Sequence, residues 1–181
     1  MIETQRLILR PWRLEDAEAL YEVAKDPRIG SQAGWPAHTS VDNSREVIEA
    51  VFMNDTTYAI CKQDSDRVIG CVGLMIGECS NFKLPSNEGE LGYWMGVPYW
   101  GHGYATEACR ALVDWGFSEL DLEKIWAGAF EDNTASQRVQ EKCGLTLHHI
   151  NEQSLWADNA EDQAKKEVIR CLTRAEWQKQ Q

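Results

Sequence analysis

The stretch that decides the fold reads GYWMGVPYWGHGYATEACRALVDWGF and covers residues 92–117. It begins with residues typical of a β-strand, breaks at Gly101-His102-Gly103, and continues with a helical pattern from Tyr104. Glycines at such a junction permit left-handed backbone and let a ligand approach the main chain, while a helix N-terminus supplies N–H donors. The arrangement therefore predicts an anion-binding turn. The alternative, which spacing alone leaves open, is that the glycines only relieve a sharp bend.

The helix after the turn carries small and apolar residues on one stripe, which predicts close packing against a sheet: Ala105, Ala108, Cys109, Leu112 and Gly116. Two familiar phosphate loops do not fit this stretch. The chain contains no G-x-x-x-x-G-K-[ST] sequence, which excludes a Walker-type loop. A dinucleotide fingerprint would need glycine or alanine where Thr106 stands, at the opening of a parallel βαβ unit. Here three strands are expected before the strand that leads into this turn.

Length and composition predict one ordinary globular domain, residues 1–181. The chain has 43% hydrophobic and 26% charged residues. No stretch is long enough for a membrane span, and the start MIETQRLILRPW lacks a signal-peptide layout, so we expect a cytoplasmic protein. The six cysteines lie far apart without a C-x-x-C pair, which favours reduced thiols over disulfides or a zinc site.

The net charge of −11 makes nucleic acid an improbable partner, because nucleic-acid binding needs clustered lysine and arginine. The charge is explained by solubility, or by attraction of a cationic substrate such as an amine or a basic protein tail.

The remaining pattern predicts strands mixed with helices in the order β-α-α-β-β-β-α-β-α-β-β, which favours a mainly antiparallel sheet covered by helices. Asp26–Ser40 holds two prolines and two glycines and is predicted to be a loop. Expected helices are Arg13–Ala24, Ser40 or Asp42 to Phe52, Tyr104–Leu120, Asn133–Cys143 and a short turn Thr173–Trp177. Expected strands are Arg6–Trp12, Thr57–Lys62, Val68–Ile76, Gly89–Val97, Lys124–Phe130, Thr146–Leu155 and Glu167–Thr173.

Several motifs in order resemble the GNAT acetyltransferases. Residues 100–105, WGHGYA, resemble the acetyl-CoA loop Q/R-x-x-G-x-G/A, departing at Trp100 in the first position. YWGHGYATEA is similar to the branch containing ribosomal-protein N-terminal (alanine) acetyltransferases. TQRLILRPWRLEDAEALYEV resembles the opening strand and helix of that branch, GELGYWMG its central strand, and NTASQRVQEKCGL its second cofactor motif. The resemblance covers nearly the whole chain.

The resemblance implies an α+β GNAT fold, with a mainly antiparallel mixed sheet of about seven strands, splayed at the cofactor strand and flanked by about four helices. It also implies acetyl-CoA as cosubstrate and no metal. The strand before the loop pairs with the pantetheine arm through main-chain groups of Tyr93, Met95 and Val97. The amides of residues 101–106 hold the diphosphate: Gly101, His102, Gly103, Tyr104, Ala105 and Thr106. The His102 side chain either touches a phosphate or is solvated.

The second motif implies that Asn133 binds the pantetheine and that Ser136 lies near the sulfur; the alternative for Asn133 is a helix cap. Many family members place a tyrosine acid seven residues after this asparagine, where this chain has Gln140. Ser136 is therefore the candidate acid.

For the base we predict Glu90 acting through water, the alternative being an exposed charge at a strand start. An amide near Met95 would meet the oxyanion. Because Cys109 and Cys143 fall on core faces, we expect direct attack in a ternary complex without an acyl-enzyme.

The acceptor is expected to be a protein N-terminal amine or a small primary amine, with Trp35 and Glu90 as substrate-binding residues. Trp35-Pro36 could instead anchor its loop. Two other functions stay open: a catalytically weak GNAT-fold protein that binds CoA or acyl-CoA, and a nucleotide-binding α/β protein. Exposed strand edges and tryptophans leave homodimer formation open.

Overall fold

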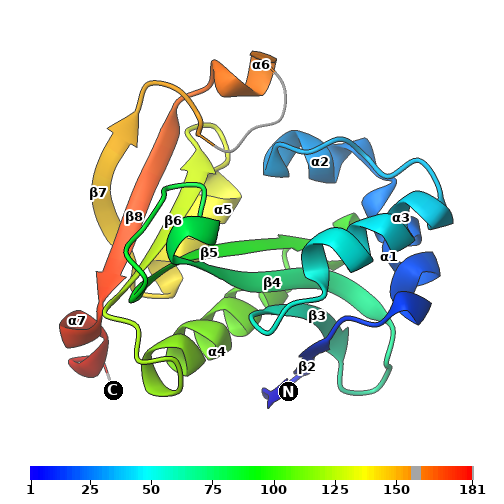
Figure 1. The fold of residues 1–181 in the computed structure, drawn as a ribbon, viewed down its shortest axis with the longest axis horizontal. Helices are drawn as coiled ribbons and strands as arrows, with labels where there is room; N and C mark the ends of the chain where they lie inside the picture. The colour runs from blue at the N-terminus through cyan, green and yellow to red at the C-terminus, as the bar shows by residue number, and fades with distance from the viewer. Residues whose placement is uncertain (156–159, 181) are drawn as a thin grey trace. The chain divides into compact units, whose positions relative to one another are not determined.

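The chain divides into two units that share strands β4 (Val68–Ile76) and β5 (Glu88–Met95) and helix α4 (Tyr104–Ser118). The computed structural model describes residues 1–155 and 160–180. We call residues 1–73 with 93–108 the N-terminal unit, and residues 74–92 with 109–181 the C-terminal unit. Figure 1 labels their helices and strands.

The N-terminal unit contains an antiparallel run of strands in the order β1-β2-β3-β4. The register pairs Leu9 of β2 with Ile60 of β3, and Ala59 of β3 with Cys71 of β4. Its core includes Trp12 and Leu20. Its other elements are β1 (Ile2–Glu3), β2 (Leu7–Pro11), η1 (Leu14–Asp16), α1 (Ala17–Ala24), α2 (Pro27–Ala33), α3 (Val41–Val47), the π-helix η2 (Ile48–Phe52), β3 (Thr57–Lys62) and η4 (Val97–Tyr99).

Helix α2 occupies part of the segment that was predicted to be a loop, so that prediction is wrong. The prolines and glycines that suggested a loop include the end signals of a short helix. The Asp26 side chain accepts a hydrogen bond from the Arg28 amide, and Pro27 is the first helical residue. Gly34 closes the helix in a left-handed conformation at φ 74°. The next helix, α3, begins at the predicted cap, where Ser40 accepts from the Asn43 amide.

In the N-terminal unit, β4 and β5 approach each other closely. The Gly96 amide donates to the Ile69 carbonyl at 2.8 Å, and a Cβ on Gly70 would lie 2.5 Å from the Trp94 carbonyl oxygen. β5 ends at Met95 rather than at the predicted Val97. The chain turns there into η4, whose Pro98 cannot donate a strand hydrogen bond.

The C-terminal unit contains strands in the order β5-β6-β8-β7, and the full sheet order is β1-β2-β3-β4-β5-β6-β8-β7. β5 and β6 are parallel and pair only from Glu88↔Lys124 to Glu90↔Trp126, although both strands continue further. The expected mixed, mainly antiparallel sheet that splays at β5 is confirmed, with the two-residue β1 as an eighth strand. The unit's other elements are η3 (Gly77–Cys79), β6 (Lys124–Phe130), α5 (Thr134–Lys142), β7 (Thr146–Asn151), α6 (Ala160–Gln163), β8 (Glu167–Thr173) and α7 (Arg174–Gln178).

Within this unit α4 packs tightly on the strands, as its small-residue stripe predicted. A Cβ on Gly116 would come within 2.8 Å of Leu74 and 3.2 Å of Ile125. β8 lies beside β6 and β7 and forms the predicted hairpin with β7, which ends at Asn151 rather than at Leu155 (Figure 1). Thr173 caps α7 in a reciprocal pair with Glu176.

Candidate functional site

The turn between η4 and α4 has the backbone conformation that its two glycines predicted. Gly101 and Gly103 have φ angles of 77° and 79°, which would cost a residue with a Cβ about 1–2 kcal/mol. A Cβ on Gly101 would meet nothing within 4 Å, so this side of the turn is open. The first intrahelical hydrogen bond of α4 runs from the Glu107 amide to the Gly103 carbonyl at 3.1 Å. The turn thus joins an open glycine face to the amide end of a 15-residue helix.

Side chains hold the outer side of this turn. His102 Nδ1 lies 2.8 Å from the Trp100 carbonyl oxygen, and the imidazole stacks on Tyr104 with ring centroids 5.7 Å apart. The Trp100 indole donates to the Met95 carbonyl at 2.7 Å. A phosphate contact from His102, if made, would therefore come from the other ring nitrogen.

The three strand residues expected to contact the pantetheine differ in position. Tyr93 and Met95 lie in β5. Val97 lies outside the strand, in η4, where its carbonyl accepts from the Trp100 amide at 3.2 Å. Val97 therefore does not continue the strand, because Pro98 turns the chain at this point. A main-chain contact from Val97 to the pantetheine stays a prediction.

Glu90 is buried in β5, with 5% of its surface exposed, so the alternative of an exposed charge at a strand start is wrong. One carboxylate oxygen accepts from Ser80 Oγ at 2.8 Å and from the Asn81 amide at 2.7 Å. The other accepts from Asn81 Nδ2 at 3.0 Å. The carboxylate therefore also anchors the segment that links β4 to β5.

At the start of α5, Asn133 and Ser136 lie one turn apart. Asn133 Oδ1 accepts from the Ser136 amide at 3.0 Å, so the helix-cap interpretation is confirmed for that oxygen. The Ser136 side chain is half-buried. Gln140, at the position where many relatives have tyrosine, is fully buried, and its Nε2 donates to the Gly128 carbonyl at 3.0 Å. The Gln140 side chain therefore lies in the protein interior, where it hydrogen-bonds to the main chain.

The cysteines on the core faces are not available as nucleophiles. Cys109 is fully buried. Burial is the main cause that raises the pKa of its thiol well above its ordinary value, and the neighbouring Cys143 is the second cause. Cys143 is 6% exposed. The six cysteines are free thiols, and only Cys79 among them is exposed.

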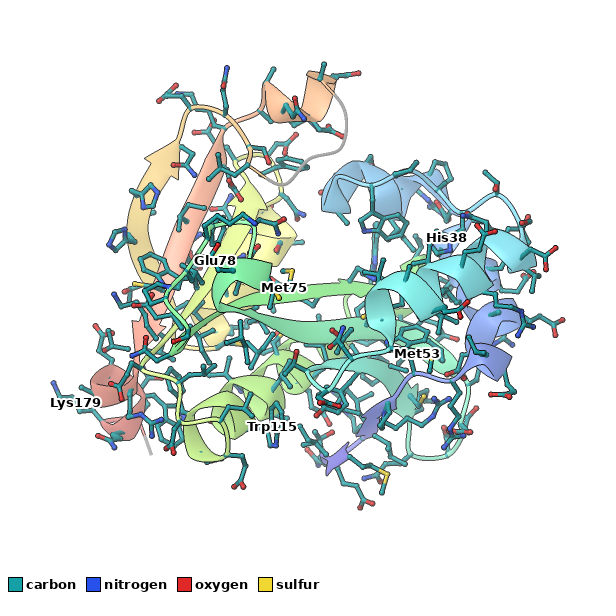
Figure 2. The ribbon with its side chains drawn as sticks, viewed as in Figure 1. His38, Met53, Met75, Glu78, Trp115 and Lys179 are labelled. Carbon is teal, nitrogen blue, oxygen red and sulfur yellow. The ribbon has the colours of Figure 1, made fainter. Side chains whose placement is uncertain are left out.

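Trp35 follows α2 and packs edge-to-face against Trp94 of β5, with ring centroids 5.8 Å apart. Figure 2 shows His38 on the segment that links α2 to α3. Its Nδ1 lies 2.8 Å from Ser44 Oγ, and burial lowers the pKa of its imidazole below 6.5. At neutral pH this cluster therefore presents aromatic rings and an uncharged imidazole.

A particular ion pair that contacts the glycine turn was not predicted from the sequence. Arg6, the residue before β2, pairs with Glu107 in the first full turn of α4 at 2.7 Å, and its Nη1 donates to the His102 carbonyl. The residues of the pair are 101 positions apart, so no local pattern joins them. The charge-bearing TQRLILR segment was the available signal, but it was used to predict a strand and a family resemblance, and no partner was predicted for Arg6.

A mixed sheet that parts at its central strand, followed by a left-handed glycine turn and a long helix, defines the class of GNAT-type acetyltransferases. Residues 6–146 match the family model described as an acetyltransferase (GNAT) domain. The chain therefore belongs to the GNAT family of N-acetyltransferases. It is 33% identical over 143 residues to an uncharacterized N-acetyltransferase, p20, of Bacillus licheniformis, covering 75% of this chain and 76% of that protein.

Two solved structures support the fold. A GNAT-family acetyltransferase from Bacillus anthracis has a TM-score of 0.81 at 22% identity, covering 96% of this chain and 98% of that one. A structure titled as a putative ribosomal-protein-serine acetyltransferase from Vibrio cholerae has a TM-score of 0.75 at 23% identity, covering 95% and 96%. Over residues 1–155 and 160–180, no helix is long and apolar enough to cross a membrane. The same described residues contain no cluster of three or more potential metal-ligating His, Cys, Asp or Glu side chains.

Proposed function

We propose that residues 1–181 act as one cytoplasmic catalytic domain that transfers the acetyl group of acetyl-CoA to a primary amine by direct attack in a ternary complex. The observation that carries this proposal is the turn at residues 101–103, which combines two left-handed glycines and an open face with the start of α4. A diphosphate carries charge that main-chain amides at a helix start can bind. The family membership of the chain supports the same ligand.

In this proposal the chain holds acetyl-CoA mainly through its backbone. The amides of residues 101–106 bind the diphosphate, and the edge of β5 at Tyr93 and Met95 pairs with the pantetheine arm. Asn133 binds the pantetheine, and the Ser136 hydroxyl lies near the sulfur. When bound, acetyl-CoA supplies a thioester whose carbonyl carbon accepts the amine and whose thiolate leaves.

The proton chemistry falls to two side chains. A primary ammonium must lose a proton before its nitrogen can attack, and Glu90 is the proposed acceptor. Because the Glu90 carboxylate is buried and already accepts three hydrogen bonds, we assign the transfer to an intervening water. The Ser136 hydroxyl donates a proton to the departing sulfur, since Gln140 is buried and bound to Gly128.

The carbonyl oxygen becomes negative during attack, and the Met95 amide is the proposed donor to it. The Met95 carbonyl already accepts from the Trp100 indole, which holds this end of the strand. Burial of Cys109 and Cys143 supports direct transfer rather than an acyl-enzyme.

A protein N-terminal amine is the acceptor that we favour, with Trp35 in its binding site. Two observations support it: the sequence branch that the chain resembles, and the structural similarity to the Vibrio cholerae protein that is described as a putative ribosomal-protein-serine acetyltransferase. A small primary amine is the second candidate, which the net charge of −11 would also attract.

Thiol release tests the proposal directly. The protein is mixed with acetyl-CoA and either N-terminal peptides of ribosomal proteins or a panel of polyamines, amino acids and aminoglycosides. Mass spectrometry then identifies the acetylated nitrogen. We expect thiol release that depends on an added amine and a product 42 Da heavier, the mass of an acetyl group replacing hydrogen. CoA binding without any amine-dependent release would favour the catalytically weak CoA-binding protein, which the replacement of tyrosine by Gln140 keeps as second candidate.

A further inference from the structure

The Glu107 carboxylate joins the segment between β1 and β2 to the first full turn of α4. Glu107 Oε1 accepts from Thr4 Oγ1 and from the Arg6 amide, each at 2.7 Å. Glu107 Oε2 accepts from Arg6 Nε at 2.7 Å. The Glu107 side chain is 16% exposed and that of Arg6 is 44% exposed. The guanidinium is thus held from one side by a carboxylate that is itself fixed by other donors.

The free end of this guanidinium lies against the glycine turn. Arg6 Nη1 donates to the His102 carbonyl oxygen at 3.0 Å. The guanidinium carbon lies 4.7 Å from the centroid of the Tyr104 ring. A Cβ on Gly103 would lie 3.5 Å from Arg6 Nη2. His102 and Tyr104 therefore contact one cation, and a side chain at Gly103 between them would also meet it.

This contact determines where the next amide points. A trans peptide is planar, and its C=O and N–H groups point in opposite directions. Because the His102 carbonyl points to Arg6, the Gly103 N–H points away from Arg6. The same relation holds two peptides earlier, in the 100–101 peptide, where the Trp100 carbonyl faces the His102 ring and the Gly101 N–H faces away from that ring. The contacts with Arg6 and the His102 ring use the carbonyls of these peptides and leave the N–H groups on the opposite side.

We propose that Arg6, held by Glu107, is a positioning residue of the diphosphate turn, which orients the 102–103 peptide so that the Gly103 N–H faces the anion. This inference rests on the proposed binding of CoA at the turn. The role is orientation rather than attraction, because the charge of Arg6 is matched by Glu107 at 2.7 Å. Lysine would keep the charge but lacks the planar fork that reaches a carboxylate and a carbonyl together.

The experiment measures the Kd for CoA by calorimetry in the wild-type protein, Arg6→Met, Arg6→Lys and Arg67→Met. Arg67 is exposed and controls for the loss of one surface charge in the same unit. We expect both Arg6 variants to bind CoA about tenfold or more weakly, and Arg67→Met to stay within about twofold. In turnover, the KM for acetyl-CoA should rise while kcat at saturation stays within about twofold.

A second readout follows the Gly103 amide itself. In wild-type protein we expect CoA to shift the Gly103 amide resonance in a ¹⁵N–¹H spectrum, and in Arg6→Met we expect a smaller shift at saturating CoA. Should Arg6→Met fail to fold, Glu107→Gln carries the same expectation, because it removes the carboxylate oxygen that accepts from Arg6 Nε.

Wild-type affinity in Arg6→Lys would show that charge, not orientation, matters and would overturn the inference. Unchanged affinity in Arg6→Met, or a loss of kcat without a change in KM, would overturn it as well. Failure of the wild-type protein to bind CoA is a different result, since it would remove the proposed function itself.

Discussion

Replacing Gly101 by alanine tests whether the open face of the turn is a binding surface. The φ angle of 77° makes any Cβ strained by about 1–2 kcal/mol, yet the added methyl group would meet no protein atom within 4 Å. For a chain of this size the strain corresponds to a loss of roughly 2–8 °C in Tm. The same methyl group would stand where the diphosphate must approach. We therefore expect the Kd for CoA to rise about tenfold or more, equivalent to about 1.4 kcal/mol.

The matched control is Gly144→Ala. Gly144 follows α5 at φ 87°, so the backbone strain is similar, and the nearest atoms that its Cβ would meet belong to the end of the flexible Gln180 side chain. Thermal unfolding and CoA calorimetry are measured on both variants. We expect similar losses of Tm, but weaker CoA binding only in Gly101→Ala. Equal CoA affinity in the two variants would refute the assignment of this face to the diphosphate and leave the sharp-bend interpretation.

Three further outcomes are expected. Asp16→Asn should lower the free energy of unfolding by about 3–5 kcal/mol in urea titrations, because Asp16 forms two hydrogen bonds with the buried guanidinium of Arg10. Asp66→Asn removes an exposed partner of the same arginine and should lower it by about 1 kcal/mol or less. Equal losses in the two variants would contradict this reasoning. Burial raises the pKa of Glu107, but hydrogen bonds from Thr4 and Arg6 outweigh burial and hold that pKa below 4.5. The ionised Glu107 carboxylate therefore stabilises the fold fully above pH 4.5, and this stabilisation is lost as the pH falls through the folded-state pKa. Plots of Tm against pH for wild type and Glu107→Gln should converge at acid pH. Parallel plots would contradict this role of the Glu107 carboxylate. Ser136→Ala should lower kcat more than it raises the KM for acetyl-CoA, and the reverse pattern would make Ser136 a binding residue.

Features that depend on neighbours in sequence could be predicted, and those that depend on distant contacts could not. The glycine turn, the stripe on α4 and the Ser40 cap follow from local backbone preferences, and each was found where expected. Helix α2 was missed although its signals were present. Proline and glycine interrupt a helix in its interior but mark its first residue and its end, and only the first meaning was applied to Pro27 and Gly34.

The residues of the candidate site also include some whose position the sequence could predict and some whose surroundings depend on distant contacts. The sequence placed Glu90 on a strand, but its burial depends on Ser80 and Asn81, which belong to an irregular segment without a periodic pattern. The Arg6–Glu107 pair depends on the docking of β2 beside the start of α4, which no spacing rule encodes. The resemblance to a known family led to the prediction that the turn is a ligand site, but it could not show which side chains contact the carbonyls of the turn.

The charges around the turn lead to a last expectation about salt. Arg6, the cation that contacts the turn, is matched by Glu107 at 2.7 Å. In the proposed function, a chain of net charge −11 would therefore bind the diphosphate chiefly through oriented main-chain N–H groups, against a long-range repulsion that salt screens. CoA affinity measured from about 0.02 to 0.5 M potassium chloride should stay level or rise. A fall of tenfold or more over that range would show that unpaired lysine or arginine side chains supply the attraction, and the assignment to main-chain amides would then be wrong.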